Sequence, residues 1–303
     1  MTCFNGLTIP VLSSIIVSMN RLSAERRGQV ISCLVEGMSI RGTVRVTGVA
    51  KNTIVKLLCD LGEACSEYQD ATLRNLDCPV IECDEIWSFC YSKQKNVPEE
   101  FKDTFGYGDV WTWTAIDADT KLVPSWLVGE RTHWDAYTFL YDLRTRLRNN
   151  RVQITTDEHQ PYLNVIDPLF GADSVDFAML HKIYGAGAAP DSADHAYSPA
   201  KCTGIDVRVI AGQPDPDRIS TSYVERQNLT MRMGMRRFTR LTNAFSKKVE
   251  NLAHAVSLHY MHYNFARPHQ TLTKKYGRPT TPAMAAGKAS YVWSVWEIAG
   301  LLD

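Results

Sequence analysis

The sequence predicts an α/β domain built on a mixed β-sheet and preceded by a smaller all-α domain. Strand-like runs at residues 80–91, 110–116 and 122–128 are followed by an amphipathic helix and one more strand, and three helical patterns come before them. Pro79 marks the junction, because proline ends a helix more readily than it continues one. The 303 residues, 45% of them hydrophobic, have room for about two domains with their own cores.

Residues 1–19 are expected to be disordered, or to be a mis-called start of translation. The run 7–17 is apolar but short, contains Pro10 and follows no positive charge, which argues against a signal peptide and against a membrane span. The eight cysteines form no CxxC pair. This predicts reduced thiols in a cytoplasmic protein and neither a disulfide framework nor a zinc site.

Residues 20–78 predict a helix-turn-helix with a helical connector behind it. Two helices begin at Ser23 and Ser39, and a third begins at Ala50 after a turn that contains Gly48. Such a turn before the last of three helices is typical of domains whose last helix enters the major groove of DNA. The residues that would face the groove are Lys51, Asn52, Thr53 and Lys56. A plain three-helix bundle with a solvated basic face would show the same pattern.

The chain carries no net charge, with 33 basic and 33 acidic residues, but these charges are unevenly distributed. Basic residues dominate from 20 to 56 and again from 226 to 248, whereas acidic residues dominate from 157 to 217. Two basic surfaces on a neutral protein indicate places where a polyanion such as DNA could bind.

Residues 79–270 predict the α/β domain. The segment 119–121 forms the hairpin turn between the second and third strands, a helix follows at 132–148, and the strand 152–156 returns beside the first. Three antiparallel strands, a helix and a returning strand describe a ribonuclease-H-like core. Further strands are expected at 176–184 and 205–210, with a weakly ordered insertion at 185–200 between them.

Two acids occupy related places in this predicted sheet. Asp84 lies in the middle of the first strand and Asp157 at the end of the fourth, so parallel neighbours would bring them together at one edge. Two close carboxylates repel each other unless they share a divalent cation, which predicts a metal site. Asp157 could instead be a turn cap, and Glu158 or His159 is equally eligible from its chemistry.

Two further acids flank Asp84 on the first strand. Strand alternation puts Glu82 on the same face as Asp84 and Glu85 on the opposite face. Either could be the functional acid in place of Asp84, as far as residue type alone decides.

A helix is predicted from the hydroxyl-rich segment 220–222 onward. One face presents Glu225, Asn228 and Arg232 together, and Arg226 lies beside them. A carboxylate next to an amide and a guanidinium suits a metal site beside a phosphate. The basic residues that could follow a DNA backbone beyond it are Arg236, Arg237 and Arg240. The alternative is a solvated helix with ordinary ion pairs.

Asp84, Asp157 and Glu225 resemble the Asp-Asp-Glu triad of transposases and retroviral-type integrases, the DDE superfamily. Further characteristic segments are CDEIWSF (83–89), DVWTWTAID (109–117), TTD (155–157), SYVERQNLTMR (222–232), HYNFARPHQTL (262–272) and TPAMAAG (281–287). Together these segments resemble the transposases of bacterial insertion-sequence-one elements. This resemblance covers roughly residues 20–303. Founding members of that family carry a zinc finger before the helix-turn-helix, and none is visible here.

The resemblance implies a DNA transposase whose three acids bind two Mg²⁺ ions, with Mn²⁺ as a substitute. Water would first free the 3′ end of the element, and that 3′ hydroxyl would then attack target DNA. The residues implied to position the scissile phosphate are Asn228, Arg232 and Arg226.

The implied partners are the terminal inverted repeats of the element and a target, both double-stranded DNA, and no membrane. A homodimer or higher oligomer would pair the two ends in the cytoplasm, at the nucleoid, with residues 271–303 as a C-terminal tail. Two other functions fit the same sequence: a catalytically inert helix-turn-helix regulator, and a metal-dependent nuclease that does not transfer strands.

Overall fold

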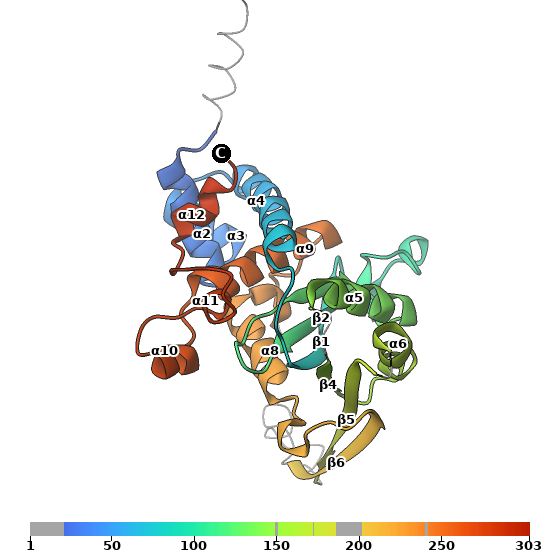
Figure 1. The fold of residues 1–303 in the computed structure, drawn as a ribbon. Coiled ribbons are helices and arrows are strands. Elements are labelled where there is room, and N and C mark those ends of the chain that lie inside the picture. The colour runs from blue at the N-terminus through green and yellow to red at the C-terminus, as the bar shows by residue number, and fades with distance from the viewer. Residues whose placement is uncertain (1–20, 149–150, 172, 186–201, 240–241) are drawn as a thin grey trace, which may run out of the picture.

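The computed structural model describes residues 21–148, 151–171, 173–185, 202–239 and 242–303. The expectations for residues 1–19 and for nearly all of the insertion 185–200 concern segments outside this part of the chain. At the centre lies a six-stranded mixed sheet in the order β3-β2-β1-β4-β5-β6 (Figure 1). This order is consistent with the predicted ribonuclease-H-like core.

The directions of the strands follow the prediction. The antiparallel strands β1 (Val80–Cys90), β2 (Gly108–Asp117) and β3 (Ser125–Gly129) come first. The chain then returns as β4 (Val152–Thr156), parallel to β1, and as β5 (Val175–Tyr184), parallel to β4. The last strand, β6 (Cys202–Ala211), contains the segment 205–210 predicted as a strand and runs antiparallel to β5 at the edge of the sheet.

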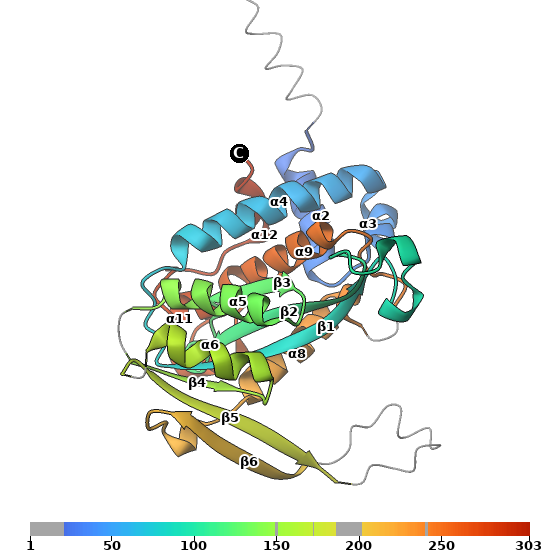
Figure 2. The same cartoon turned by 90° about the vertical axis from the view of Figure 1, so that its right-hand side faces the viewer.

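Helices cover both faces of the sheet (Figure 2). One face packs against α5 (His133–Arg146) and α6 (Gln160–Phe170), and the other against α8 (Ser222–Gly234) and α9 (Val249–Met261). The other helices are α2 (Ala24–Val35), α3 (Ile40–Thr47), α4 (Lys51–Thr72), α10 (Gln270–Tyr276), α11 (Pro282–Ala285) and α12 (Val295–Gly300).

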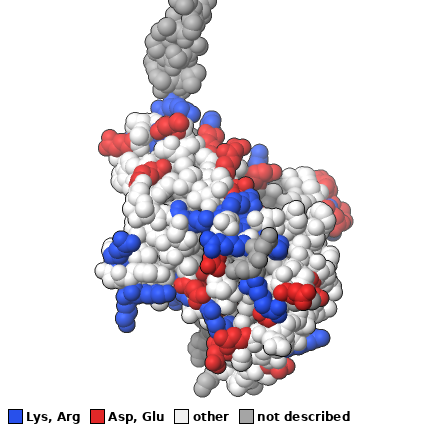
Figure 3. Space-filling model, in the orientation of Figure 1, with Lys and Arg blue, Asp and Glu red and all other residues white. Residues whose placement is uncertain are grey.

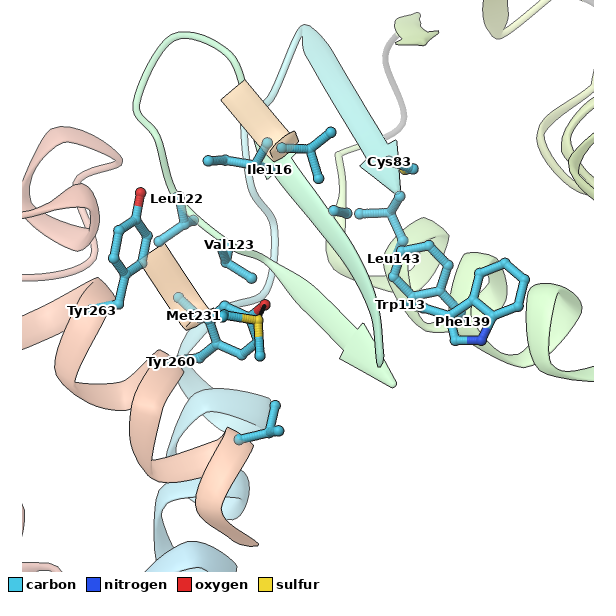
Figure 4. Packing of buried hydrophobic residues seen from close by; sticks show 14 of the residues in the cluster. Cys83, Trp113, Ile116, Leu122, Val123, Phe139, Leu143, Met231, Tyr260 and Tyr263 are labelled. Atoms are coloured by element: carbon cyan, nitrogen blue, oxygen red, sulfur yellow. Dashed lines mark hydrogen bonds between the residues drawn. The ribbon is translucent and has the colours of Figure 1, made fainter. Parts of the chain in front are cut away.

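Strand β2 is buried on both sides because helices pack on both of its faces (Figure 4). On one side Trp113 lies against Phe139 of α5, with ring centroids 5.9 Å apart. On the other side the hydroxyls of Thr114 and Tyr260 of α9 are hydrogen-bonded at 2.7 Å, and Tyr260 also donates to Met231 of α8. The core therefore continues through the sheet from α5 to α8 and α9.

The first two helices begin and end close to where the sequence predicts. Ser23 Oγ accepts a hydrogen bond from Arg26 N at 3.3 Å, and Ser39 Oγ accepts one from Gly42 N at 3.0 Å. Gly48 ends α3 with φ of +69°, a conformation that costs glycine little. The short third helix and the connector predicted after it are one continuous helix, α4, of 22 residues.

Helix α4 lies along α9 and shares its buried polar contacts. Ser257 Oγ donates to Gly62 O at 2.7 Å, and Gln69 Nε2 donates to Ser257 O at 3.3 Å. Leu61 and Cys65 on α4 belong to the same continuous hydrophobic core as the sheet. The helices that precede Pro79 are therefore packed onto the rest of the chain.

Several boundaries differ from the predicted ones for identifiable reasons. Strand β3 begins at Ser125 and not at 122, because Pro124 has no N–H to donate to a sheet. Helix α6 was not predicted, since a sequence with prolines at 161 and 168 lacks the usual signature of a helix. At the C-terminal end α12 packs on α2, where Arg27 forms an ion pair with Asp303 at 2.7 Å.

Among the described residues no helix is both long enough and apolar enough to cross a membrane.

Candidate active site

Strands β1 and β4 bring two of the predicted acids side by side. Their parallel register pairs Cys83 with Thr156, so the next residues along, Asp84 and Asp157, are neighbours where β4 ends. Carboxylate oxygens of Asp84, Glu85 and Asp157 all lie within 4.8 Å of one another. The structure thus assembles an acidic cluster of three, of which the sequence predicted two.

Asp84 is held at the centre of this cluster by two hydrogen bonds. Its Oδ1 accepts from the backbone N of Glu85 at 2.8 Å, and its Oδ2 accepts from Asn228 Nδ2 of α8 at 2.7 Å. Burial raises the pKa of Asp84 to about 7, and the nearby charge of Asp157 is the next cause. A cation bound here would offset both the cost of burying the charged carboxylate and its repulsion by Asp157.

Asp157 is more exposed, with 41% of its side chain accessible. Its Oδ1 accepts a hydrogen bond from His159 N at 3.0 Å, so it also caps the turn before α6. The guanidinium of Arg131 lies 3.8 Å from Asp157 and 3.8 Å from Glu85. Partial burial still raises the pKa of Asp157, although Arg131 opposes the shift.

Glu85 points to the other face of the sheet, next to Trp113 and the start of α6. Its side chain is fully buried, and neither carboxylate oxygen has a hydrogen-bond partner among the described residues. His159 Nε2, 3.5 Å away, is the nearest basic group. Burial, with the charges of Asp157 and Asp84, raises the pKa of Glu85 to about 9, so this acid keeps its proton at neutral pH.

The sequence left Glu85 open as an alternative to Asp84, and strand alternation placed it on the opposite face of the strand. That geometry is correct for the strand. Asp157, however, stands beyond the last residue of β4, at the open end where carboxyls from both faces can approach one another. Three acids within four residues of one strand were the available signal.

Glu225, the third predicted acid, lies on α8 outside the group of three. Its carboxylate accepts a hydrogen bond from Thr221 Oγ1 at 2.8 Å and forms an ion pair with Lys182 of β5. Its charge contributes to the raised pKa of Asp84 and of Asp157, which places it in the electrostatic neighbourhood of both. With 43% of its side chain exposed, Glu225 lies at the rim of the cluster.

Glu82 caps a helix, a role that the sequence analysis did not predict. Its Oε2 accepts from the backbone N of Tyr223 at 2.7 Å and of Val224 at 3.0 Å. It thus caps the N-terminus of α8 from strand β1, where a carboxylate also opposes the positive end of the helix dipole. Burial nevertheless raises the pKa of Glu82 to about 7. This contact fixes the helix that carries Glu225 and Asn228 against the strand that carries Asp84.

The other residues predicted on α8 lie at different depths. Asn228 is buried and holds Asp84, as described above. Arg226 is exposed on the surface of the helix. Arg232 lies one turn further on and donates to the backbone oxygen of Phe238 at 3.4 Å.

The residues predicted to contact DNA are mostly exposed. Lys51, Asn52 and Thr53 form the first turn of α4 and are open to solvent, and Lys56 pairs with Asp60 at 2.5 Å. Arg236 is exposed, and Figure 3 shows lysines and arginines gathered across the middle of one face. Arg237 is instead half-buried and donates a hydrogen bond to Ser246 Oγ at 2.8 Å. Arg240 lies outside the described residues.

The acidic cluster has the donor set of a hard divalent cation. Magnesium and manganese prefer carboxylate oxygens, and the cluster offers three carboxylates close enough to share one ion. The two oxygens of Glu85 without a partner and the crowding of Asp84 with Asp157 are both relieved by a positive charge. The residues present therefore fit such an ion.

Between about pH 7 and about pH 9, where the buried histidines are neutral in both the folded and the unfolded state, the metal-free protein is expected to lose stability as the pH rises. Glu85 and Asp84 keep their protons in the folded state up to pKa values of about 9 and about 7. In the unfolded chain the same carboxyls lose them near pH ~4. The folded state binds more protons in this window, so its free energy of unfolding falls as pH rises.

Thermal unfolding in a chelator at several pH values measures this effect. Added Mg²⁺ or Mn²⁺ should raise the midpoint most at the alkaline end, where the acids must otherwise carry charge. Combined Asp84→Asn and Glu85→Gln substitution should flatten the pH dependence. A midpoint in chelator that rises with pH across this window would contradict the assignment of these raised pKa values.

No family model matches this chain, and neither does any curated protein. Among solved structures it is similar to the cryo-EM structure of the piggyBac transposase synaptic complex with hairpin DNA. That match has a TM-score of 0.41 and 9% identity, over 95% of this chain and 74% of the other. The crystal structure of the Mos1 strand transfer complex matches with a TM-score of 0.24 and 11% identity, over 85% of each chain. Both scores are too low to carry an argument, so function is inferred below from the residues of this chain.

Proposed function

We propose that this chain is a metal-dependent DNA transposase of the insertion-sequence-one type, which frees the 3′ ends of its element and joins them to target DNA. The observation that carries the proposal is the meeting of Asp84 and Asp157 on adjacent parallel strands, in a sheet whose strand order matches a ribonuclease-H-like core. Helix α8, which bears Glu225, is fixed to the same strand by Glu82.

In this proposal Asp84 and Asp157 hold divalent metal, Mg²⁺ by preference, with Glu225 or Glu85 as the third acid. Bound metal would activate the attacking oxygen and stabilise the leaving 3′ oxygen of a phosphodiester. Asn228 keeps the Asp84 carboxylate in one orientation through its 2.7 Å hydrogen bond. Arg131, 3.8 Å from Asp157, supplies a fixed positive charge beside the place where a phosphate would approach.

The remaining basic residues would bind the DNA duplex. The exposed first turn of α4, with Lys51, Asn52 and Thr53, is proposed to contact the terminal inverted repeats in the major groove. Residues 20–78 would then be the DNA-reading unit, ahead of a catalytic domain over 79–270. Arg226, Arg232 and Arg236 would follow the backbone near the cleavage site.

A joining assay tests the proposal. The substrate is a duplex with a recessed 3′ end taken from the inverted repeats that should flank the gene, with a supercoiled plasmid as target and Mg²⁺ or Mn²⁺ as metal. The expected product is repeat DNA covalently joined to the plasmid through its 3′ end. Cutting without joining would replace the proposal by a nuclease, and repeat binding without either reaction by an inert regulator.

A further inference from the structure

Strand β6 is the outermost strand of the described sheet, and it is exposed over most of its length (Figure 2). Its only extensive packing among the described elements is with β5. Ile205, Val207 and Val209 nevertheless keep 58%, 42% and 54% of their surface in solvent. These three alternate with polar residues, so they form one apolar row on one face of the strand.

An exposed edge strand of this kind can form a β-ladder with a strand of another chain. An edge strand presents unpaired backbone N–H and C=O groups, and proteins that must stay single protect it with charged side chains, proline, bulges or a short length. The segment Cys202–Ala211 is ten residues long and contains neither lysine nor proline, its register shifts lie near its ends, and its two charges, Asp206 and Arg208, are of opposite sign. Its register with β5 is regular from Gly204 to Val209, so the middle of the strand is straight enough to accept a neighbour.

We propose that β6 pairs antiparallel with β6 of a second copy of this chain, about a two-fold axis through Val207. In this register Asp206 of each copy lies opposite Arg208 of the other, on one face of the joined sheet. On the other face Ile205 of each copy lies opposite Val209 of the other. Opposite charges and β-branched pairs directly across two strands are both stabilising.

The neighbouring registers lack this match. An axis through Asp206 places the two aspartates opposite each other, and an axis through Arg208 does the same with the two arginines, which repel. An axis between two residues would set side chains of opposite faces against each other, which an antiparallel pair does not allow. Of these registers, only the axis through Val207 places Asp206 opposite Arg208. Neither residue has an ion pair within its own chain among the described residues.

The apolar row gains most from this arrangement. It lies on the same face of the sheet as Ala178 and Leu180 of β5, which are already buried. Joining two copies makes the row continuous across the axis, with three apolar residues from each copy. The interface follows from the strand itself and does not depend on the proposed reaction with DNA.

The test uses the full chain without DNA, with its mass measured by light scattering during size-exclusion chromatography over a range of concentrations. The expected result is a dimer for the natural sequence. Asp206→Arg or Arg208→Asp puts like charges opposite each other and should raise the dissociation constant at least tenfold. The double exchange of both residues restores the pairing and should restore the dimer. Glu67→Arg, at an exposed position on α4, is the matched control and should change nothing.

A cysteine cross-link provides a second readout that does not depend on the charge variants. In a Cys202→Ser background, Val207→Cys should form a disulfide between two copies under mild oxidation, because the two positions face each other across the axis. Thr203→Cys, far from the axis, should cross-link much less. A monomeric natural sequence, a dimer that both single charge variants leave intact, or a double exchange that fails to restore the dimer would each overturn the proposal.

Discussion

Asp84→Asn and Asp157→Asn are each expected to lower DNA cleavage and joining by on the order of a thousandfold, since metal-ion catalysis is worth several kcal/mol. An amide has the size of the carboxylate but no negative charge, so it binds a divalent cation poorly. The Asn at position 84 can still accept the hydrogen bond from Asn228, which keeps the local fold. The rate of 3′-end joining with Mg²⁺ is the measurement.

Two controls separate lost chemistry from lost structure. Glu67→Gln removes an exposed acid from α4 and should keep full activity. Binding of repeat DNA in a chelator, followed by mobility shift, should be unchanged or stronger in the Asp84 variant, because a crowded negative charge has been removed. Activity of the Asp84 variant within tenfold of the natural protein would sink the metal assignment.

The same assay decides which acid completes the cluster. At neutral pH Glu85 carries its proton in the absence of metal, so Glu85→Gln nearly preserves that state and should fold normally. A large loss of activity in this variant would therefore report metal binding by Glu85. If Glu225→Gln loses activity and Glu85→Gln keeps it, the predicted triad holds and α8 must move Glu225 inward from Lys182 when metal binds.

The part of the site that could be predicted depends on regular backbone geometry. The period of two along β1 and the parallel return of β4 follow from local sequence patterns, and together they place Asp84 beside Asp157. Helical spacing likewise puts Glu225 and Asn228 on one face of α8. These relations need no knowledge of side chains elsewhere in the chain.

The remainder depends on tertiary contacts that no local pattern contains. Glu82 was one of three equivalent acids in the sequence, and only the arrival of Tyr223 N at its carboxylate shows that it caps a helix. The position of Glu85 in the cluster depends on β4 ending one residue before Asp157. The two pieces predicted for α4 became one helix because α9, about 190 residues later in the chain, packs along it.

Gly62→Ala is expected to destabilise the whole protein by about 1–3 kcal/mol, the usual cost of overpacking. In an isolated helix the same change would stabilise by roughly 1 kcal/mol, because alanine is the better helix former. Here a Cβ atom on Gly62 would lie 2.6 Å from His254 Cα and 2.7 Å from its carbonyl oxygen. Backbone atoms cannot rotate away as a side chain can, so α4 and α9 must separate. Denaturant unfolding followed by circular dichroism measures the change.

Gly300→Ala, at the last residue of α12, is the matched control, since a Cβ atom there meets nothing within 4 Å and the change should be neutral or slightly stabilising. The shape of the transition carries further information. Helix α4 contributes Leu61 and Cys65 to the core that also holds β1 and β2, so the Gly62 variant should unfold in one step at lower denaturant. A variant that loses only an early, separate transition would show that residues 20–78 fold on their own, and that the contact between α4 and α9 joins two independent units.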